Sequence, residues 1–535
     1  MHQFNIMNQF LAALFCSFCL TSFAQDQLDN IDVLSYDMTI EVGDKDNVIH
    51  VKEIVKIKLL NETPRFYLNL ISVDDASGMG MKISQIVDGE KKLVFVEHTN
   101  DKVWFSPNKK SPGDELTFTI VYSGIPKTGL IIGKNKFGDR TFFGDNWPNR
   151  ASHWIACLDH PSDKAMVNFT VIAPKKYQCI ATGEFLVSTE YNRKKQINYF
   201  ESKIQLPTKV MVIGLAEFDI EKIKSKHVFE MSIWAYSKDA KNGFSDMAVA
   251  KDVVDYFVST IGEYPFEKLV NVQSTTQFGG MENAGNIFYD EKAVKGEGTM
   301  EALIAHEIAH QWFGNSASEA DWKHLWLSEG FATYFTDLYW ENKYGTEAMN
   351  ERLFGERARV INFSKQYNHP VVDSTYESLM VLLNPHSYQK GAWFLHMLRN
   401  ELSDSVFWNG IRSYYNEFKF GNATTADFQR VMESECHFSL EKFFDQWLYQ
   451  TQQPKLKINY NSTDDQEILS IHQLQNTFVF DFNLEIEFNY VDGSSEIKTF
   501  KISREKEVFV LKNTSMVSSM KYDPNVKLLF EQVEN

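Results

Sequence analysis

The sequence predicts a multidomain α+β protein with an N-terminal all-β domain, a mainly helical central domain and a C-terminal β-sandwich. Three observations lead to this fold class. The chain has 535 residues, which are too many for a single hydrophobic core. Its hydrophobic pattern changes from strand-like to helical near residue 221, and it becomes strand-like again after Pro454. We therefore expect domains at residues 25–220, 221–453 and 454–535.

The first 24 residues are expected to lie outside the fold. They contain the uncharged apolar run FLAALFCSFCLTSFA, which is too short to span a membrane and ends in a small-residue pattern at Ala24. This pattern is typical of a secretory signal peptide that is cleaved after Ala24. We therefore expect an exported protein, either periplasmic or secreted, without stable membrane insertion.

The N-terminal and C-terminal domains are predicted from strand patterns. Segments such as DVLSYDMTIEV and VIHVKEIVKIKLL alternate apolar with polar residues or are rich in β-branched ones, and turn clusters such as SPGD separate the strands. After Pro454 the alternation returns, and the Asp-Gly pair in YVDGSSEI is typical of a hairpin. About eighty residues suffice for a small sandwich of strands.

The central domain is predicted from helical stretches that follow one another, with a few short strands among them. The stretches include TMEALIAHEIAHQWFG, LWLSEGFATYFTDLYWENKYG, SYQKGAWFLHMLRNEL and SLEKFFDQWLYQ.

Charge and cysteine content exclude some classes of protein. The formal net charge of −17 argues against nucleic-acid binding, which needs Lys and Arg to neutralise phosphates. Beyond the signal peptide the chain has Cys157, Cys179 and Cys436, which lack the CxxC spacing of a zinc site and are too few for a disulfide framework. A Cys157–Cys179 bridge and buried free thiols are both open.

The strongest chemical signal is HEIAH, His306 to His310. On a helix, residues four apart share a face, so both imidazoles point to one spot and Glu307 projects beside it. Two histidines in this geometry suit two of the three protein ligands of a catalytic zinc ion. The alternative is a buried helix that carries two histidines by chance, which the motif alone does not exclude.

Glu329 is the candidate third ligand. It lies near the start of the next apolar helix after His310, and two antiparallel helices joined by a loop can bring it back to the histidines. A His-His-Glu set leaves one position for water, which is typical of a catalytic zinc site. Glu307 is then placed to take the proton of that water. We therefore expect one Zn²⁺ per chain and a zinc hydrolase.

A second signal is the stretch TTQFGGMENAGN, in which Glu282 lies close to two glycines. Glycines at a strand edge indicate that something approaches the backbone closely, and an acid beside them indicates that it carries a positive charge. The alternative is a tight turn with a solvated glutamate.

The segments FGGMENAGN, HEIAHQWFGN, LWLSEGFATYF and SYQKGA, in this order and spacing, resemble the M1 family of zinc metallopeptidases, which contains aminopeptidase N and the leukotriene hydrolase. WIACLDHPSDKA extends the resemblance upstream, although Ala156 stands where a proline is usual. The resemblance implies a thermolysin-like central domain and an aminopeptidase acting on peptides with a free N-terminus.

The resemblance also implies roles for individual residues. Glu307 matches the general base, and Tyr388 matches the tyrosine that stabilises the oxyanion of the intermediate. The positions that match the zinc ligands are His306, His310 and Glu329. Glu282 matches the acid that holds the substrate's α-amino group, and the neighbouring positions that match the substrate-binding backbone are Gly279, Gly280, Met281 and Asn283.

The sequence departs from the family pattern at two places. Many members have an acid where this chain has Thr336, and Asp337 follows it, so a carboxylate that orients a ligand is missing or shifted by one residue. Many members also continue into a large C-terminal helical domain. We expect a short form that lacks this domain and has a more open substrate groove.

Several alternatives stay open at this point. A zinc endopeptidase or a catalytically inactive, peptide-binding family member would also fit parts of the pattern. In the N-terminal domain, Asp145 or Asn146 is expected to assist Glu282. Phe278 and Met281 favour a broad preference for neutral or hydrophobic N-terminal residues, whereas the physiological substrate and the oligomeric state are not predicted.

Overall fold

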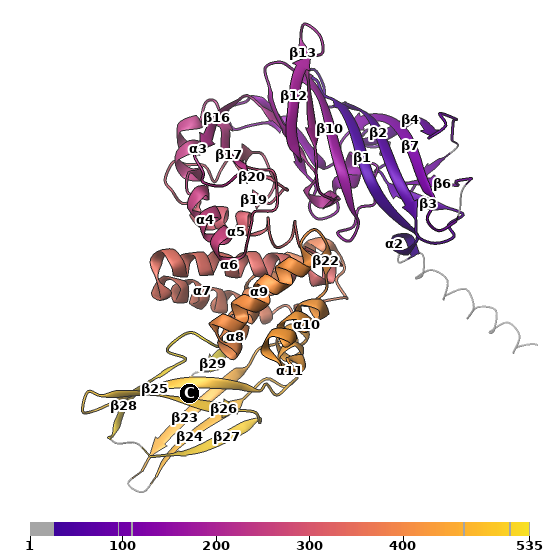
Figure 1. Ribbon diagram of the computed structural model, residues 1–535. Coiled ribbons are helices and arrows are strands. Elements are labelled where there is room, and N and C mark those ends of the chain that lie inside the picture. The colour runs from indigo at the N-terminus through magenta and orange to yellow at the C-terminus, as the bar shows by residue number, and fades with distance from the viewer. Residues whose placement is uncertain (1–25, 95, 109–110, 464–465, 513–514, 534–535) are drawn as a thin grey trace, which may run out of the picture. The chain divides into compact units, whose positions relative to one another are not determined.

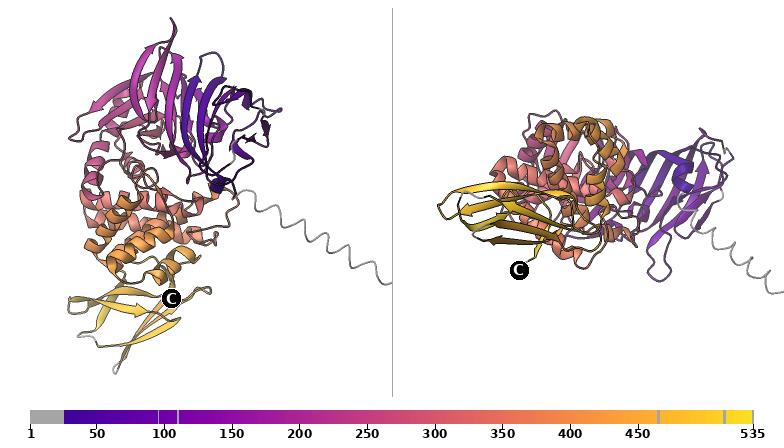
Figure 2. Two further views of the ribbon diagram at one scale, coloured as in Figure 1. Left: turned by 45° about the vertical axis from the view of Figure 1, so that its right-hand side comes forward. Right: turned by 90° about the horizontal axis from the view of Figure 1, so that it is seen from below.

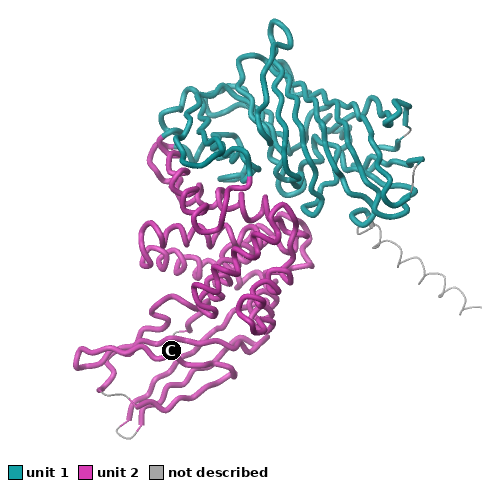
Figure 3. The backbone as a smooth tube through the Cα atoms, viewed as in Figure 1, with its two compact units in different colours: residues 1–244, 266–294 teal, residues 245–265, 295–535 magenta. Residues whose placement is uncertain are grey.

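The computed structural model describes residues 26–94, 96–108, 111–463, 466–512 and 515–533. The predicted signal peptide lies outside these residues and stays a prediction. The described chain forms two compact units (Figure 3). Unit 1 comprises the residues up to Phe244 together with Phe266–Val294, and unit 2 comprises Ser245–Pro265 together with the residues from Lys295 onwards.

Unit 1 is built mainly from strands (Figures 1 and 2). Its largest sheet has the order β12-β13-β10-β1-β2-β7-β4, and β14 pairs with β10. These strands are β12 (Glu184–Glu190), β13 (Lys195–Glu201), β10 (Lys164–Pro174), β1 (Ile31–Glu41), β2 (Ile49–Leu59), β7 (Glu115–Ile125), β4 (Gly80–Asp88) and β14 (Leu206–Pro207). The short helix α2 (Asp26–Asn30) precedes β1.

Three smaller sheets complete unit 1. One has the order β11-β15-β9-β8 and another the order β3-β6-β5. Their strands are β11 (Gln178–Ala181), β15 (Ile213–Ala216), β9 (Arg140–Asp145), β8 (Gly129–Lys134), β3 (Phe66–Asn69), β6 (Lys102–Phe105) and β5 (Glu97–Thr99). The third has the order β16-β17-β18-β20-β19 and comprises β16 (Phe218–Ile223), β17 (Glu230–Tyr236), β18 (Lys268–Ser274), β20 (Asn286–Asp290) and β19 (Gly280–Met281).

The alternation predicted for the first two strands appears in their burial. Along most of β1 and β2 every second side chain is buried, and the two strands pair antiparallel. Val33, Tyr36 and Val55 are completely buried on the inner face. The predicted β-rich N-terminal part is therefore confirmed.

The compact units do not coincide with the predicted division at residue 220. The sheet of β16–β20 was expected in the central domain, but it belongs to unit 1. Its strands come from residues 218–236 and 268–290, and the parallel pairing of β17 with β18 joins the two stretches. The segment between them contains helix α4 (Ala250–Thr260) of unit 2, so the chain passes from one unit to the other and back.

A buried acid lies in the core of unit 1. Glu53 on β2 is completely buried, and its Oε2 accepts hydrogen bonds from the Tyr122 hydroxyl at 2.7 Å and the Ala156 backbone N–H at 3.0 Å. Burial raises the pKa of Glu53 to about 8, because the two hydrogen bonds only partly offset the loss of solvation.

Replacing Glu53 with glutamine is expected to change how stability depends on pH. Between the ordinary value of 4.5 and about 8, the folded protein holds a proton on Glu53 that the unfolded chain has released, so this residue's contribution to stability falls as the pH rises. The variant lacks this loss. The free energy of unfolding of the variant, relative to that of the wild type, should therefore rise by about 3 kcal/mol between pH 5 and pH 7.

Urea denaturation of both proteins at the two pH values measures this difference. Glu62→Gln, at an exposed position, is the matched control. The prediction would be contradicted if the free energies of unfolding of Glu53→Gln and wild type differed by the same amount at pH 5 and at pH 7.

Unit 2 contains most of the helices (Figure 1). Helix α3 (Ala240–Met247) crosses the division between the units, and the longer helices of unit 2 are α5 (Glu301–Ala309), α6 (Trp326–Tyr344), α7 (Thr346–Ser364), α8 (Gly391–Leu402), α9 (Asp404–Phe418) and α10 (Thr425–Cys436). The short α11 (Glu441–Phe444) follows α10, and two π-helices are η5 (His386–Lys390) and η6 (Asp445–Tyr449).

Helix α6 is the central helix of unit 2. From Trp326 to Tyr339 every side chain is buried, because α5, α7 and α8 all pack against it. The helix ends at Gly345, whose φ of +91° favours glycine. The predicted helical central part is therefore confirmed.

The chain after Pro454 forms two sheets. One has the order β27-β24-β23-β29 and the other β26-β25-β28. Their strands are β23 (Lys455–Ser462), β24 (Glu467–Gln473), β27 (Lys506–Leu511), β29 (Glu531–Val533), β25 (Phe482–Tyr490), β26 (Ser495–Ile502) and β28 (Val517–Tyr522). The Asp-Gly pair lies in the turn between β25 and β26, which pair antiparallel as predicted.

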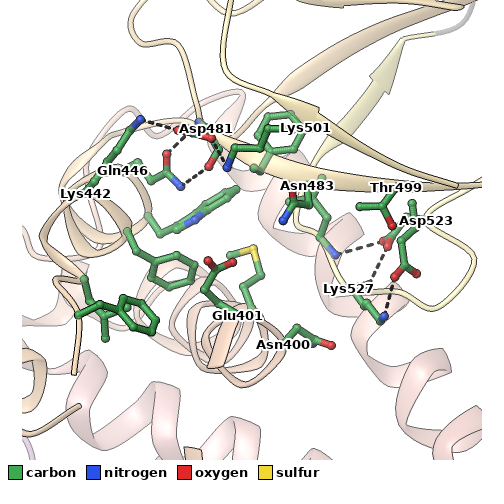
Figure 4. Close-up of a pocket in the computed structure, with 18 of the residues that line it drawn as sticks. Asn400, Glu401, Lys442, Gln446, Asp481, Asn483, Thr499, Lys501, Asp523 and Lys527 are labelled. Carbon is green, nitrogen blue, oxygen red and sulfur yellow. Dashed lines mark hydrogen bonds and ion pairs between the residues drawn. The ribbon is translucent and has the colours of Figure 1, made fainter. Parts of the chain in front are cut away.

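Polar contacts join these C-terminal strands to the helices of unit 2 (Figure 4). The Asp481 carboxylate lies 2.5 Å from the ammonium groups of both Lys442 and Lys501, and the Gln446 side chain exchanges two hydrogen bonds of 3.0 Å with the Asp481 backbone. These residues line a pocket of about 330 Å³. Nearby, the buried Arg357 of α7 pairs with Asp523. The strands and the helices therefore form one compact unit.

Among the described residues, Cys157, Cys179 and Cys436 are free thiols. Cys157 and Cys179 are buried in unit 1 and form no bridge, so of the two predicted alternatives the buried thiols are correct. In the part of the chain that the structure describes, no helix has both the length and the apolar character needed to cross a membrane.

Candidate active site

The predicted metal ligands lie together in unit 2. His306 is in the last turn of α5, His310 caps the end of that helix, and Glu329 is in the first turn of α6. The Nε2 atoms of the two histidines are 3.1 Å apart. Glu329 Oε2 is 3.4 Å from His306 Nε2 and 3.2 Å from His310 Nε2. The structure therefore brings all three residues to one point.

The spacing of these three donor atoms fits a tetrahedral zinc ion. Nitrogen and oxygen ligands about 2.0–2.2 Å from zinc at tetrahedral angles lie about 3.3–3.6 Å from one another. The observed separations run from 3.1 to 3.4 Å. Glu329 Oε2 is buried and accepts no hydrogen bond of regular geometry from the described residues, so the site suits a cation better than a hydrogen-bond donor.

The charge states of the donors also suit a metal. Burial lowers the pKa of His306, so its imidazole is neutral at neutral pH. Burial alone would raise the pKa of the Glu329 carboxyl, but the two imidazoles outweigh this effect and hold the pKa well below its usual range. A neutral His306 and an ionised Glu329 are in the forms that bind zinc.

Groups behind His310 fix its ring. His310 Nδ1 lies 3.2 Å from the Phe313 carbonyl oxygen and 3.1 Å from Ser328 Oγ. Donation from Nδ1 to the carbonyl directs the Nε2 lone pair toward the metal position. A Cβ at Gly314, where φ is +121°, would lie 2.3 Å from Ser328 Oγ, so only glycine allows the backbone to pass this closely.

The predicted general base and the predicted oxyanion donor both lie next to His306. Glu307 is on α5 next to His306 and is 5% exposed. Tyr388 lies in the π-helix η5, and its ring stacks on the His306 ring with centroids 5.9 Å apart and planes 13° apart. Single-turn π-helices are frequent at functional sites.

A pair of glycines brings α6 against η5 and α8. A Cβ at Gly330 would lie 2.9 Å from the Gly391 Cα, and a Cβ at Gly391 would lie 3.0 Å from the Gly330 Cα. Gly330 directly follows Glu329, and Gly391 lies three residues after Tyr388. The contact therefore fixes how closely the elements carrying these two side chains approach. Sequence reasoning missed this role, although the glycines stand in the motifs LSEGF and QKGA.

In unit 1, Glu282 follows a strand at a sheet edge, as predicted. β19, which consists of Gly280 and Met281, pairs antiparallel with β20 and is the last strand in its sheet. The Gly279 carbonyl accepts a hydrogen bond from the Asp290 N–H at 3.0 Å. Glu282 is 4% exposed, so the alternative of a solvated glutamate in a turn is wrong. Asn283 beside it is completely buried.

Asp145 and Asn146 serve neighbouring segments of unit 1. The Asn146 amide donates to the carbonyls of Thr208 and Met211 at 2.9 and 2.6 Å. Asp145 pairs with Arg150 at 2.5 Å and accepts from the Gln277 backbone N–H at 3.0 Å. Arg150 also donates to the Gln277 side chain at 3.0 Å. Asp145 thus holds the segment that leads to Gly279.

The acid next to Thr336 has a partner away from the ligands. The Thr336 hydroxyl donates to the Ala332 carbonyl within α6 at 2.8 Å. Asp337 is completely buried and accepts from Arg352 Nε of α7 at 2.6 Å. The shifted carboxylate therefore joins α6 to α7.

Two family models match the chain. The Peptidase M1 N-terminal domain matches residues 33–210, and the Peptidase family M1 domain matches residues 246–447. Together they cover most of unit 1 and the helical part of unit 2, including every predicted metal ligand.

Individual relatives agree with these matches. Glutamyl aminopeptidase of Sus scrofa is 27% identical over 355 residues, which cover 63% of this chain and 37% of the relative. Probable aminopeptidase 2 of Sulfurisphaera tokodaii is 27% identical over 69% of this chain and 47% of the relative. Aminopeptidase A of Gloydius brevicauda is 28% identical over 63% of this chain and 36% of the relative. The chain thus spans less than half the length of these relatives. Because both family models match, the chain belongs to peptidase family M1.

Proposed function

We propose that this chain is a zinc-dependent aminopeptidase that hydrolyses the N-terminal peptide bond of peptides. The observation that carries the proposal is the convergence of His306, His310 and Glu329 beside the buried Glu307. Membership of family M1 and the names of the relatives support the same reaction class.

The two histidines and Glu329 would hold the zinc ion. When bound there, zinc would act as a Lewis acid and make water nucleophilic near neutral pH. Glu307 takes the proton from the attacking water and delivers it to the leaving amine nitrogen. The Tyr388 hydroxyl donates a hydrogen bond to the oxyanion that develops on the scissile carbonyl.

Glu282 would determine which peptide bond of the substrate is cleaved. A buried carboxylate stabilises the α-ammonium group of a peptide, and the β19 edge at Gly280 and Met281 can pair with an extended peptide. Anchoring the free amine makes the first peptide bond the one that is cleaved. An internal peptide segment brings no charge to Glu282 and is therefore disfavoured.

Two different preferences are suggested for the side chain of the substrate's first residue. Two of the relatives quoted above are named glutamyl aminopeptidase and aminopeptidase A, whereas Phe278 and Met281 of this chain favour neutral or hydrophobic residues. A panel of substrates that differ only in the first residue tests this preference.

We also propose that the two C-terminal sheets pack as a β-sandwich. Ring contacts between them support this arrangement, since Tyr460 of β23 contacts Phe488 of β25 and Phe500 of β26 contacts Phe509 of β27. A crystal structure in which the two sheets did not face each other would contradict it.

The reaction is tested with one peptide in free and N-acetylated form, incubated with zinc-loaded and with chelated protein. We expect cleavage of the free peptide only, one residue at a time, and loss of cleavage on chelation. Comparable cleavage of the acetylated peptide would make the chain an endopeptidase. No cleavage of either peptide by zinc-loaded protein would favour the catalytically inactive, peptide-binding alternative.

A further inference from the structure

The π-helix that carries Tyr388 ends at a buried lysine. Lys390 is 1% exposed, and its ammonium group donates to the carbonyl oxygens of Gln450 and Gln452 at 3.2 and 3.0 Å. Among the described residues its hydrogen-bond partners are carbonyls and not carboxylates, and burial lowers the pKa of Lys390 to about 7. A lysine placed in this way costs stability, and an apolar side chain of similar shape would avoid that cost.

The other end of the same π-helix is also held by a buried polar side chain. His386 is 1% exposed, and its Nδ1 donates to the His369 carbonyl at 2.9 Å. Its Nε2 lies 2.9 Å from Ser364 Oγ, and this hydroxyl lies 3.1 Å from Gln453 Oε1.

Both ends of the π-helix therefore connect to one short segment. Residues 450–453 lie between the π-helix η6 and strand β23, and they receive the contacts from Lys390 and, through Ser364, from His386. A lysine can join two carbonyls in this way, because its ammonium group donates up to three hydrogen bonds.

The segment 450–453 and the two residues after it make hydrogen bonds to the C-terminal part of unit 2. The Glu531 N–H of β29 donates to the Pro454 carbonyl at 2.8 Å, and the Thr477 hydroxyl donates to the Gln452 side chain at 3.2 Å. The Lys455 N–H donates to the Gln475 side chain at 2.9 Å. These contacts link the segment and the residues that follow it to the C-terminal sheets.

We propose that Lys390 is a positioning residue, which holds the π-helix against residues 450–453 so that the Tyr388 ring keeps its place on His306. The proposal rests on the role given to Tyr388 under the proposed function. It also gives the C-terminal strands a part in the reaction, because they hold the segment to which Lys390 is bound.

The test is a double-mutant cycle of Lys390→Met and Tyr388→Phe, with kcat, KM and bound zinc measured for each protein. Lys390→Met alone is expected to lower kcat roughly ten- to hundredfold, since a misplacement of about 1 Å can cost about a hundredfold. KM and the zinc content should stay near wild type. In the Tyr388→Phe background the same change should lower kcat by less than about threefold, because two residues acting through one group are not additive.

Other outcomes overturn the inference in distinguishable ways. An equal loss of kcat in both backgrounds, or no loss at all, would mean that Lys390 does not act through Tyr388, while the proposed function would stand. If Tyr388→Phe itself kept full kcat, the role proposed for the tyrosine would be wrong, and the inference would fail with it. A crystal structure of Lys390→Met with the Tyr388 ring still stacked on His306 would also overturn it.

Two further variants keep the test decisive. If Lys390→Met does not fold, Ser364→Ala removes the link at the other end of the π-helix, and the same cycle should give a smaller loss in the same direction. Equal losses in both backgrounds would again overturn the inference. Lys365→Met replaces an exposed lysine next to Ser364 and should leave kcat unchanged.

Discussion

Replacing Glu307 with glutamine is expected to lower kcat by about a hundred- to ten-thousandfold, the contribution typical of a positioned general base. Glutamine has the same shape but cannot accept the proton of the attacking water. Because Glu307 is not among the three converging donors, the zinc content should stay at one per chain. Steady-state kinetics on a free peptide, together with metal analysis, measures both quantities.

The matched control is Glu297→Gln, at an exposed position in the segment before α5. It should leave kcat and zinc content unchanged. A Glu307→Gln variant that lost its zinc would assign this residue to metal binding, and one that kept full kcat would remove it from the mechanism.

Replacing Glu282 with glutamine is expected to remove most of the preference for a free N-terminus. Loss of a buried charge partner costs about 2–5 kcal/mol, which lowers kcat/KM for a free peptide roughly thirty- to several-thousandfold. An N-acetylated peptide has no ammonium group to lose, so any residual turnover of it should not fall. The ratio of the two kcat/KM values measures the effect.

Glu221→Gln, at an exposed position in unit 1, is the control for this experiment. If Glu282→Gln lowered kcat/KM equally for both peptides, the residue would have a structural role instead of binding the amine.

Local pattern predicted much of the fold. The alternation in β1 and β2 and the apolar stretch of α6 each reflect burial within one element, so they can be read from neighbouring residues. The placement of β16–β20 in unit 1 could not be predicted in this way. It depends on the parallel pairing of β17 with β18, which joins residues separated by a helix that belongs to the other unit.

The same limit applies to the candidate site. His306 and His310 share a helix face, and their convergence follows from a spacing of four residues. The place of Tyr388 depends on a π-helix and on the contact between Gly330 and Gly391, which lie sixty-one residues apart in the sequence. Such a contact has no local pattern. It can be found only once α6 and α8 are packed together.

The three unbridged thiols described above make the two units differ in their chemical reactivity. Burial raises the pKa of Cys157 and Cys179, and the thiolate is the form that reacts with oxidants and alkylating agents. These two thiols are therefore protected from such reagents for as long as unit 1 stays folded. Cys436 ends α10 in unit 2 and is only half-buried, so an oxidising environment would reach it first and leave the core of unit 1 intact.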